Sequence, residues 1–482
     1  MQTGKDLYQA HKLMQQRMGM ALLQAEPDVP ESPMRRLNTA MLIGLVLAVV
    51  VAAGFGIWGL IKPGNATKLT DPGQLLVEEE TGATYVYSEQ EGKLLPVANY
   101  VSGRLLLDGS ADVKSRNVTA ASLAKFTRGK MVGIPGAPSS LPDKKRLIRG
   151  PWSVCVAADG SGRPYVSLVG GQNVGGTPLS GSRAMVVGTA QETFVVWNNQ
   201  KFEVPQPLVR VVSNGSRPRQ MPASWLNAIP TGPPFTTPTI QDRGKVTTAP
   251  GGRRGRIGQI YTVPAVAGAE ARWYVLLADG LAPVLHTQAE LLRQDPASKT
   301  AYGRAPVTPF QIDAATANST PVSKTELRVG GLPTTMPQMI SPSASSPLCA
   351  VYANADKGST RASITVGNSL PLPAPRTSGN TQENVSQVLL PPGGAALVGL
   401  LPGEGQLGSI TNYYLITDQG LRFGLPTGDV LGKLGYTAKD ASPLPSHLIH
   451  LVPPGPDLDP AAARNPVQVT APEPIRSPSP QQ

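Results

Sequence analysis

Two cysteines are the residues of this sequence with the clearest covalent chemistry. Cys155 and Cys349 are the only cysteines among its 482 residues. In an oxidising compartment, a single pair forms a disulfide by default. The loop-entropy model credits a bridge over such a long loop with at most about 5 kcal/mol. Two buried free thiols are the alternative, and the wide separation excludes a metal-ligand motif.

A Ser-x-x-Lys pattern occurs at Ser122-Leu123-Ala124-Lys125. Penicillin-recognising enzymes use this pattern for acyl transfer, but they also need Ser-Asp-Asn and Lys-Thr-Gly elements. The sequence contains neither of these elements. We therefore interpret the segment as a solvated helical turn.

A histidine pair, His447 and His450, has the spacing that places two zinc ligands on one helix face. A metal site needs three or four ligands, and no third is evident here. The same stretch aligns with a segment that carries Ser224 and Asn227 instead, so we expect both histidines to be surface residues. With four histidines in all, acid–base catalysis at neutral pH has few candidates.

A glycine-rich segment occupies residues 170–176 with the sequence GGQNVGG. A phosphate-cradling loop has the pattern Gly-x-x-x-x-Gly-Lys-Ser/Thr and opens a helix. This segment has no following lysine and no helix signal, and the pattern occurs nowhere else in the chain. We therefore interpret it as a loop and expect no intrinsic ATP hydrolysis, no cofactor, no metal and no catalytic residue.

A long apolar segment near the N-terminus decides where these residues lie. Residues 40–61 contain no charged side chain. As a helix they would rise about 33 Å, enough to cross a hydrocarbon core of about 30 Å. A buried core helix is one alternative, but the run is too long for it and is apolar on every face. A cleaved signal peptide is the other, but it would start close to the N-terminus. We therefore predict a retained transmembrane anchor.

The basic residues around this span predict its orientation. Those that precede it are Lys5, Lys12, Arg17, Arg35 and Arg36. Only Lys62 and Lys68 follow within about twenty residues, so the positive-inside rule places the N-terminus in the cytoplasm and the rest outside the membrane. Trp58 fits an interfacial anchor near the outer end.

A short amphipathic helix precedes the span. Its apolar stripe has spacings of three and four residues and consists of Leu7, Ala10, Met14, Met18 and Ala21. Because an isolated helix of this length is marginal in water, we predict that the stripe docks on a partner protein. A helix lying on the bilayer surface is the alternative.

The composition excludes several classes of protein. Gly 51 and Pro 49 make up about a fifth of the chain, so long regular helices cannot dominate. Hydrophobic residues at 40% exclude a wholly disordered chain, and charged residues at 16% argue against a coiled coil. The net charge of +11 would suit an anionic partner, although scattered surface cations explain it as well, and we expect no nucleic-acid binding.

A hairpin pattern occurs four times beyond the span. Its first strands begin at Tyr85-Val86-Tyr87, Phe194-Val195-Val196, Trp273-Tyr274-Val275 and Tyr413-Tyr414-Leu415. Each triplet is followed by a polar turn and a short strand ending at proline, which predicts a β-hairpin. Residues 222–233 align without a gap to residues 445–456, and 134–138 resembles both. We interpret the pattern as four repeats, the end of the third being too degenerate to align.

Two long insertions separate the repeats and carry the two cysteines. Both contain strand-like runs, so a Cys155–Cys349 bridge would unite them into a central β domain. The first repeat would then lie beside the fourth, and the second beside the third. We predict an α+β protein: a single N-terminal transmembrane helix, then an elongated extracytoplasmic region of four small α/β repeats around a central β domain.

The expected organisation follows from these boundaries. Its parts are a cytoplasmic helix (1–39), the transmembrane helix (40–61), a linker (62–83), repeat 1 (84–137), the central domain (138–192 and 318–411), repeat 2 (193–240), a connector (241–271), repeat 3 (272–317), repeat 4 (412–463) and a Pro-rich tail (464–482). The proline-rich stretch from Pro453 onward predicts extended or disordered chain.

Together these features resemble the EccB family, single-span membrane components of the type VII (ESX) secretion system. The resemblance covers nearly the whole chain and rests on the span, the four hairpins, the cysteine pair and an N-terminal helix that includes residues 9–13 and Arg17. It implies four periplasmic repeats around a central β domain with one disulfide. It also implies assembly with EccC, EccD and EccE in the inner membrane, and we expect the periplasmic regions to self-associate.

The family role implied is a structural core component that organises the periplasmic part of the export machine. Family members are also often described as ATPases, which would make ATP a ligand. A cell-wall-binding membrane protein is the other alternative, and an exposed aromatic repeated at one position would favour it. The repeated aromatics here lead strands, where packing explains them equally well.

Overall fold

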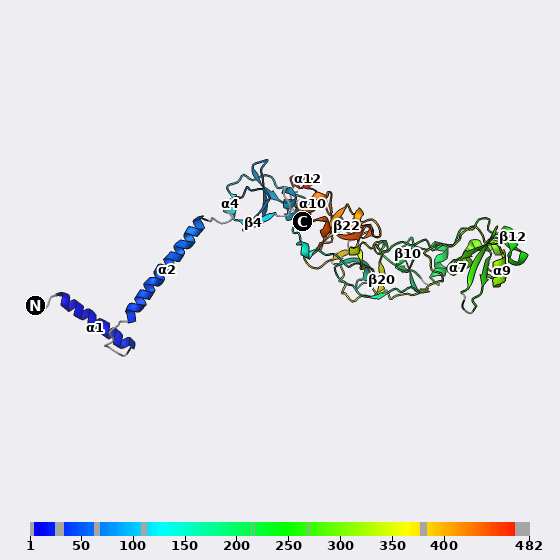
Figure 1. Cartoon of the computed structure of the whole chain (residues 1–482), viewed down its shortest axis with the longest axis horizontal. Coiled ribbons are helices and arrows are strands. Elements are labelled where there is room, and N and C mark those ends of the chain that lie inside the picture. Colours follow the sequence, from blue (N-terminus) through cyan, green and yellow to red (C-terminus); the bar gives the residue numbers. More distant parts are fainter. Residues whose placement is uncertain are drawn as a thin grey trace, which may run out of the picture.

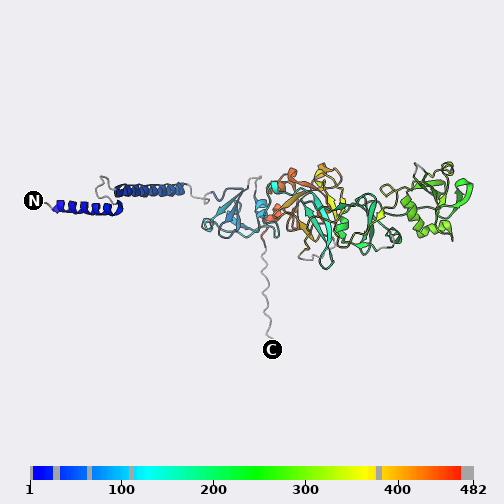
Figure 2. The same ribbon diagram turned by 90° about the horizontal axis from the view of Figure 1, so that it is seen from below.

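The structure, a computed structural model, describes residues 4–24, 33–61, 68–107, 113–213, 215, 217–266, 268, 270–375 and 383–467. It is elongated, with two helices at one end followed by a row of small β-sheets (Figures 1 and 2). The chain runs out along this row and comes back, because segments from the C-terminal third lie between the first sheet and the middle of the row.

The two N-terminal helices are α1 (Gly4–Gln24) and α2 (Pro33–Ile61). The amphipathic pattern and the apolar run therefore both form helices, as predicted. Within α2, Leu37–Gly59 has a mean hydropathy of 2.7 and no buried part, so it is long and apolar enough to cross a membrane. α2 begins several residues before the apolar run, at Pro33, a residue favoured at the first helical position because it has no N–H.

Four sheets share one strand order, and we call them hairpin sheets one to four. Their strands, in chain order, are β1 (Gln74–Glu78), β2 (Thr84–Ser88), β3 (Lys93–Val97) and β4 (Lys114–Val118); β8 (Arg183–Gly188), β9 (Thr193–Trp197), β10 (Gln200–Glu203) and β11 (Arg219–Gln220); β14 (Ile260–Val263), β15 (Arg272–Leu277), β16 (Gly280–Val284) and β17 (Phe310–Gln311); β22 (Ala395–Leu401), β23 (Tyr413–Thr417), β24 (Arg422–Leu425) and β25 (Ser442–Pro445). The first three strands form an antiparallel meander, and the fourth pairs in parallel with the first.

Each hairpin sheet has a strand that the hairpin pattern did not include. The first strands β1, β8, β14 and β22 all lie before the residues where the repeats were expected to begin. A hairpin is a local signal, whereas the first strand is also held by a parallel partner far along the chain. In hairpin sheet two, β18 (Gln338–Met339) adds a further parallel pairing to β8.

A returning segment bridges the third strand at the same place in all four hairpin sheets. The bridged pairs are Leu94 with Arg128, Lys201 with Thr231, Leu281 with Val322, and Arg422 with Pro454. Residues 134–138, which resemble this segment in sequence, do not form the bridge of the first copy, because it lies earlier, at Arg128. In the third copy the bridge lies at Val322, beyond the expected boundary at residue 317.

The residue after each bridge shows why the segment is hard to align. Gly232 follows one bridge, and a Cβ there would lie 2.5 Å from the ring of Phe202. Gly455 follows another, and a Cβ there would lie 2.6 Å from the ring of Phe423. In hairpin sheet three the corresponding ring is replaced by Ala282, and Ser323 takes the place of the glycine. In hairpin sheet one Gly129 follows the bridge, and a Cβ there would meet the Leu95 side chain. The glycine is therefore found where a large side chain of the third strand faces it.

A six-stranded sheet combines the two insertions. Its strands are β5 (Trp152–Ala158), β6 (Pro164–Gly170), β7 (Thr177–Pro178), β19 (Leu348–Tyr352), β20 (Ser363–Val366) and β21 (Gln387–Leu389). Their order is β21-β6-β5-β19-β20-β7, so each insertion contributes an edge strand to the hairpin of the other. The two insertions are interlocked at both edges as well as paired in the middle.

The remaining elements are short, as the Gly and Pro content requires. The helices are α3 (Tyr100–Leu106), α4 (Ala120–Leu123), α5 (Gln206–Val212), α6 (Ala223–Asn227), α7 (His286–Gln294), α8 (Lys299–Tyr302), α9 (Ala314–Ser319), α10 (Gly428–Lys433), α11 (Ser446–His450) and α12 (Pro460–Ala463). A separate two-stranded hairpin of β12 (Val246–Ala249) and β13 (Arg253–Arg256) stands at the end of the row far from α2 (Figure 1).

Shared cores join the sheets into a continuous row. One core includes the six-stranded sheet with hairpin sheets two and four, represented by Val154, Trp225 and Leu448. Another joins α3, which follows β3 of hairpin sheet one, to hairpin sheet four, and a third includes Leu208 of α5 with Leu291 of α7. The row is therefore held by buried apolar contacts along its length.

The Pro-rich stretch is partly ordered, contrary to expectation. Residues 453–467 include α12, and Leu458 and Ala463 are fully buried in the core between hairpin sheets one and four. Val467 donates a backbone hydrogen bond of 2.9 Å to Met131. Two apolar side chains among the prolines are enough to dock this part. The expected disorder of residues 468–482 lies outside the described residues.

Candidate functional site

The two cysteines are bonded to each other in the middle of the six-stranded sheet. Cys155 on β5 lies directly opposite Cys349 on β19, and both are fully buried. The bond closes a loop with a sequence separation of 194, which contains hairpin sheets two and three. These two sheets form the distal arm of the molecule, and the disulfide lies at its base.

The glycine-rich segment 170–176 is a tightly packed loop between β6 and β7. A Cβ on Gly170 would lie 2.7 Å from the Trp152 ring. Ser369 donates its backbone N–H to the carbonyl of Val174 at 2.8 Å. The segment leads into a strand and its glycines face neighbouring chain, so it has neither the open cradle nor the helix start that a bound phosphate needs.

The Ser122-x-x-Lys125 pattern lies at α4, as the predicted helical turn. The Ser122 hydroxyl is 3.0 Å from the hydroxyl of Thr119, and Lys125 is exposed. This local contact stabilises the turn and does not activate the serine.

The histidine pair separates into two different environments. His450 is exposed, but His447 is half-buried, which corrects the expectation that both are surface residues. Nε2 of His447 lies 2.8 Å from the hydroxyl of Tyr352 on β19. Burial and then the charge of Lys201 lower the pKa of His447 from 6.5 to about 4. Among the described residues no group of three His, Cys, Asp or Glu side chains could hold a metal.

Tyr352 connects three parts of the molecule. Its hydroxyl donates a 2.6 Å hydrogen bond to the carbonyl of Ala228, in the segment after α6, while His447 lies in α11. Nζ of Lys201 donates to the nearby carbonyl of Leu226 at 2.8 Å. Sequence reasoning aligned the α6 and α11 segments but did not show that one tyrosine of the central sheet contacts both.

Hairpin sheets one and four meet through a buried arginine. Nε of Arg104 in α3 donates to the carbonyl of Lys433 at 3.0 Å, and Nζ of Lys433 donates to the carbonyl of Leu107 at 3.0 Å. The Tyr436 hydroxyl donates to the carbonyl of Pro142 at 2.7 Å. These contacts connect residues about three hundred positions apart and fix the sheet nearest α2 to the returning chain.

The apolar stripe of α1 is exposed along its whole length. Leu7, Met14 and Met18 are 67%, 65% and 58% exposed, and Ala10 and Ala21 are also exposed. On α2, the side chains from Leu37 to Gly59 are likewise exposed, Trp58 among them at 64%. Both helices therefore present apolar surface that the described part of the chain does not cover.

The aromatic residues that lead the hairpins are not a repeated exposed set. Tyr85 and Phe194 are buried, and Trp273 and Tyr413 are half-buried. Trp273 stacks on the His286 ring with centroids 4.7 Å apart. Packing accounts for these side chains, so they do not form the sugar-binding platform that wall binding would require.

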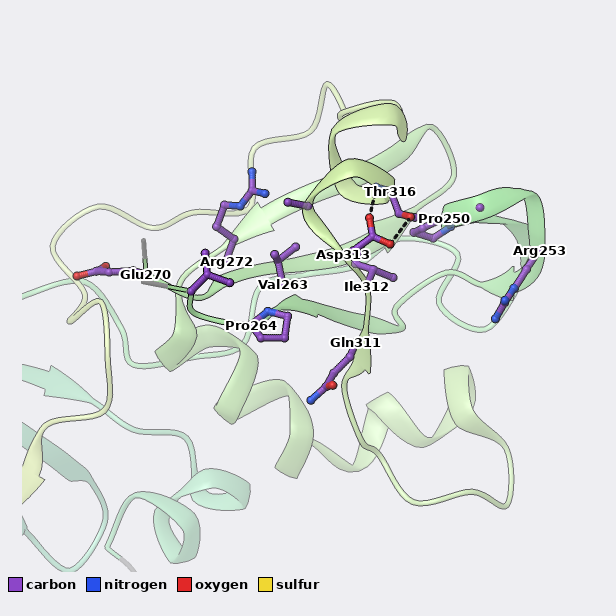
Figure 3. A pocket seen from close by; sticks show the side chains of 13 residues that line it. Pro250, Arg253, Val263, Pro264, Glu270, Arg272, Gln311, Ile312, Asp313 and Thr316 are labelled. Carbon is purple, nitrogen blue, oxygen red and sulfur yellow. Dashed lines mark hydrogen bonds between the residues drawn. The ribbon is translucent and has the colours of Figure 1, made fainter. Parts of the chain in front are cut away.

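A groove at the distal end of the row was not anticipated from the sequence. It has a volume of about 710 Å³ and lies in hairpin sheet three, between the β12–β13 hairpin and α9 (Figure 3). Its floor is apolar, with Val263, Pro264 and Ile312, and guanidinium groups of Arg253 and Arg272 lie at its two ends. The Arg253-Arg254-Gly255-Arg256 run was the available sequence signal.

Comparison with known proteins finds one family over nearly the whole chain. Residues 2–471 match the family model described as "Type VII secretion system ESX-1, transport TM domain B". The ESX-2 secretion system ATPase EccB2 of Mycobacterium tuberculosis (strain CDC 1551 / Oshkosh) is 26% identical over 455 residues, covering 89% of this chain and 88% of that protein. The ESX-3 secretion system ATPase EccB3 of Mycolicibacterium smegmatis (strain ATCC 700084 / mc(2)155) is 27% identical over 441 residues, covering 86% and 80%.

Solved structures share the fold. A chain of an intact ESX-5 inner membrane complex superposes with a TM-score of 0.64 at 23% identity, covering 99% of this chain and 98% of that chain. A chain of an EccB3 dimer from the ESX-3 core complex gives 0.60 at 24% identity, covering 81% and 99%. The family match, the apolar helix α2 and the shared fold agree: this chain belongs to the EccB family and is a structural component of a type VII secretion membrane complex.

Proposed function

We propose that the chain is the anchored periplasmic scaffold of its secretion complex. α2 crosses the inner membrane once, α1 lies in the cytoplasm, and the row of sheets extends outward on the other side. The observation that carries this proposal is the continuous row itself, in which buried cores join each hairpin sheet, or a helix beside it, to a neighbouring sheet. A rod held by packing can place a distal surface at a fixed distance from the membrane.

We also propose that the four hairpin sheets are repeats of one unit around the six-stranded sheet. The common strand order and the bridge at the same strand position support this. Hairpin sheets two and four have the matched pairs Lys201 over the Phe194 ring and Arg422 over the Tyr414 ring, at 5.3 Å and 5.6 Å. Buried cores join neighbouring units, which is how repeated units build a long rigid body.

The partners proposed are the EccC, EccD and EccE components and further copies of this chain. The exposed stripe of α1 supports a protein groove as its dock, supplied by EccC or EccD, because a lone helix of this length has too little intrinsic stability. The negative charge of Asp6 reduces the net positive charge of α1, which weakens the attraction of this helix to anionic lipid. Self-association of the periplasmic regions accords with the dimer known for the relative EccB3.

Topology can be tested with two engineered cysteines, because the native pair is bonded. Ser161→Cys lies in an exposed loop beyond the span, and Gln15→Cys lies on α1. An impermeant maleimide should label the first and not the second in intact spheroplasts. Labelling of both sites, or of Gln15→Cys alone, would overturn the orientation.

Assembly can be tested by purifying the full chain from mild detergent and identifying the membrane proteins that accompany it. The proposal expects the other type VII secretion components in constant ratio. Recovery of the chain free of them at every detergent concentration would contradict a scaffold role.

A further inference from the structure

The distal groove combines features that a binding site needs and that the scaffold role does not use. Its floor is apolar, and Val266 in its lining is exposed at 69%. It lies at the far end of the row from α2 (Figure 1). Exposed apolar surface in a charged rim is typical of an interaction site.

One wall of the groove is the edge of hairpin sheet three. In the parallel ladder between β14 and β17, Gln311 is the partner of Thr262, and Ile312 donates its N–H to the carbonyl of Thr262 at 3.0 Å. In this pattern Thr262 forms its hydrogen bonds with the residues on either side of Gln311. The backbone N–H and C=O of Gln311 therefore point away from β14, toward the open edge of the sheet. An outward N–H and C=O on an edge strand are a template for another extended chain.

The charges of the groove are distributed unevenly. At one end Arg253 has no hydrogen-bond or ion-pair partner in the described part of the chain, and Arg254 and Arg256 follow on the same strand. At the other end lie Glu270 and Arg272, whose side chains point in different directions (Figure 3), and Arg272 uses one N–H to bond Asn318 at 3.2 Å.

Asp313 lies between the two ends and is occupied by its own helix. One carboxylate oxygen accepts the N–H of Thr316 at 2.7 Å, and the other accepts its hydroxyl at 3.1 Å. These bonds lower the pKa of Asp313, first through the backbone N–H of Thr316. Arg253 and Glu270, at opposite ends of the groove, are therefore the charged lining residues without a hydrogen-bond or ion-pair partner in the described part of the chain, and the Arg253 end is cationic.

We propose that this groove receives an extended peptide segment of a partner protein. Apolar side chains of the peptide would pack on the floor formed by Val263 and Ile312, and a carboxylate of the peptide would bind Arg253. Strand addition along Gln311 would supply main-chain hydrogen bonds, and the guanidinium would select for an acidic side chain. The site goes beyond the scaffold role, because it assigns the distal end of the rod a ligand of stated chemistry.

The test uses the full chain in detergent micelles and a rhodamine-labelled octapeptide of alternating Val and Glu. Anisotropy should show saturable binding, and Arg253→Glu should weaken it at least about tenfold, the loss expected for one charge-assisted bond. Arg254→Glu is the matched control, because Arg254 neighbours Arg253 but points to the opposite face of β13 and does not line the groove. It should change the affinity by less than about twofold, and both variants should melt as the parent protein does.

Two further peptides separate strand addition from simple attraction. An octapeptide with Lys in place of Glu should bind at least about tenfold more weakly. One with N-methyl groups on alternate residues keeps its charges but loses backbone donors, and it should also bind at least about tenfold more weakly. The proposal is overturned if the Glu peptide fails to bind at millimolar concentration, or if N-methylation has no effect. Equal losses in Arg253→Glu and Arg254→Glu, or tighter binding of inorganic polyphosphate with the same loss, would indicate a general polyanion surface and would also overturn it.

Discussion

The hydroxyl of Tyr352 and Nε2 of His447 lie 2.8 Å apart, across the contact between the six-stranded sheet and α11. The hydroxyl has one proton, which it donates to the carbonyl of Ala228. Nε2 of His447 must therefore carry the ring proton and donate to the tyrosine oxygen. The Tyr352 hydroxyl thus holds the segments after hairpin sheets two and four against the six-stranded sheet. In this contact His447 is a neutral hydrogen-bond donor.

Acid should weaken this joint. The pKa of His447 is about 4 in the folded protein because of burial and the charge of Lys201, against 6.5 in an unfolded chain. As the pH falls below 6.5 the unfolded chain takes up the proton first, so the free energy of unfolding falls until about pH 4, by up to about 3 kcal/mol. The His447→Gln variant should lack this part of the decrease in stability. The measurement is the melting temperature of both proteins from pH 7 to pH 4, and the difference between them should change with pH. Parallel curves would contradict the assignment.

Removing the tyrosine hydroxyl should cost stability at neutral pH. Tyr352→Phe leaves the buried carbonyl of Ala228 without its donor, an expected loss of about 1–3 kcal/mol in urea unfolding. His450→Ala, an exposed residue of the same helix as His447, is the control and should change stability by less than about 0.5 kcal/mol.

The ring and glycine pairs of the hairpin sheets should be energetically coupled. Gly232→Ser places a Cβ 2.5 Å from the Phe202 ring and should destabilise by about 1–3 kcal/mol. The double variant with Phe202→Ala reproduces the alanine and serine pair of hairpin sheet three. Its loss of stability should be smaller than the sum of the two single losses by at least about 1 kcal/mol. Gly181→Ser, where a Cβ meets nothing within 4 Å, should be nearly neutral. Additive single changes would argue against the equivalence of the sheets.

Two charges in the α1 stripe should uncouple the chain from its partners. Met14→Asp with Met18→Asp places unpaired carboxylates in the proposed contact, which is costly enough to abolish docking. The double variant should reach the membrane at normal level, because α2 is untouched, yet lose its co-purifying proteins and secretion. Gln16→Asp, on the other side of the helix, is the control. Normal assembly of the double variant would show that the stripe is not a docking element.

The purified full chain should turn over no ATP above a protein-free blank. The sequence has no phosphate-binding loop pattern, and the glycine-rich loop 170–176 is packed against neighbouring chain. Phosphate release is the measurement. Activity that follows the protein through two orthogonal columns would contradict the prediction and would call for a nucleotide site of another kind.

Local patterns were sufficient for the parts of the fold that depend on neighbours in sequence. Apolar length predicted α2, spacing predicted α1, and alternating strands around polar turns predicted the four hairpins. Each of these signals arises within about thirty residues, where side-chain periodicity reports the backbone directly. The pairing of Cys155 with Cys349 was expected because no other cysteine competes.

Tertiary structure alone decided what joins these parts. The first strand of each hairpin sheet and the exchanged edge strands β7 and β21 depend on partners far along the chain, which no local period encodes. His447 could not be separated from His450 by type or spacing, because only the position of Tyr352 makes one of them a buried donor. The distal groove likewise exists only once β13, β14 and α9 are folded together, since its cationic end and its strand edge come from segments about sixty residues apart.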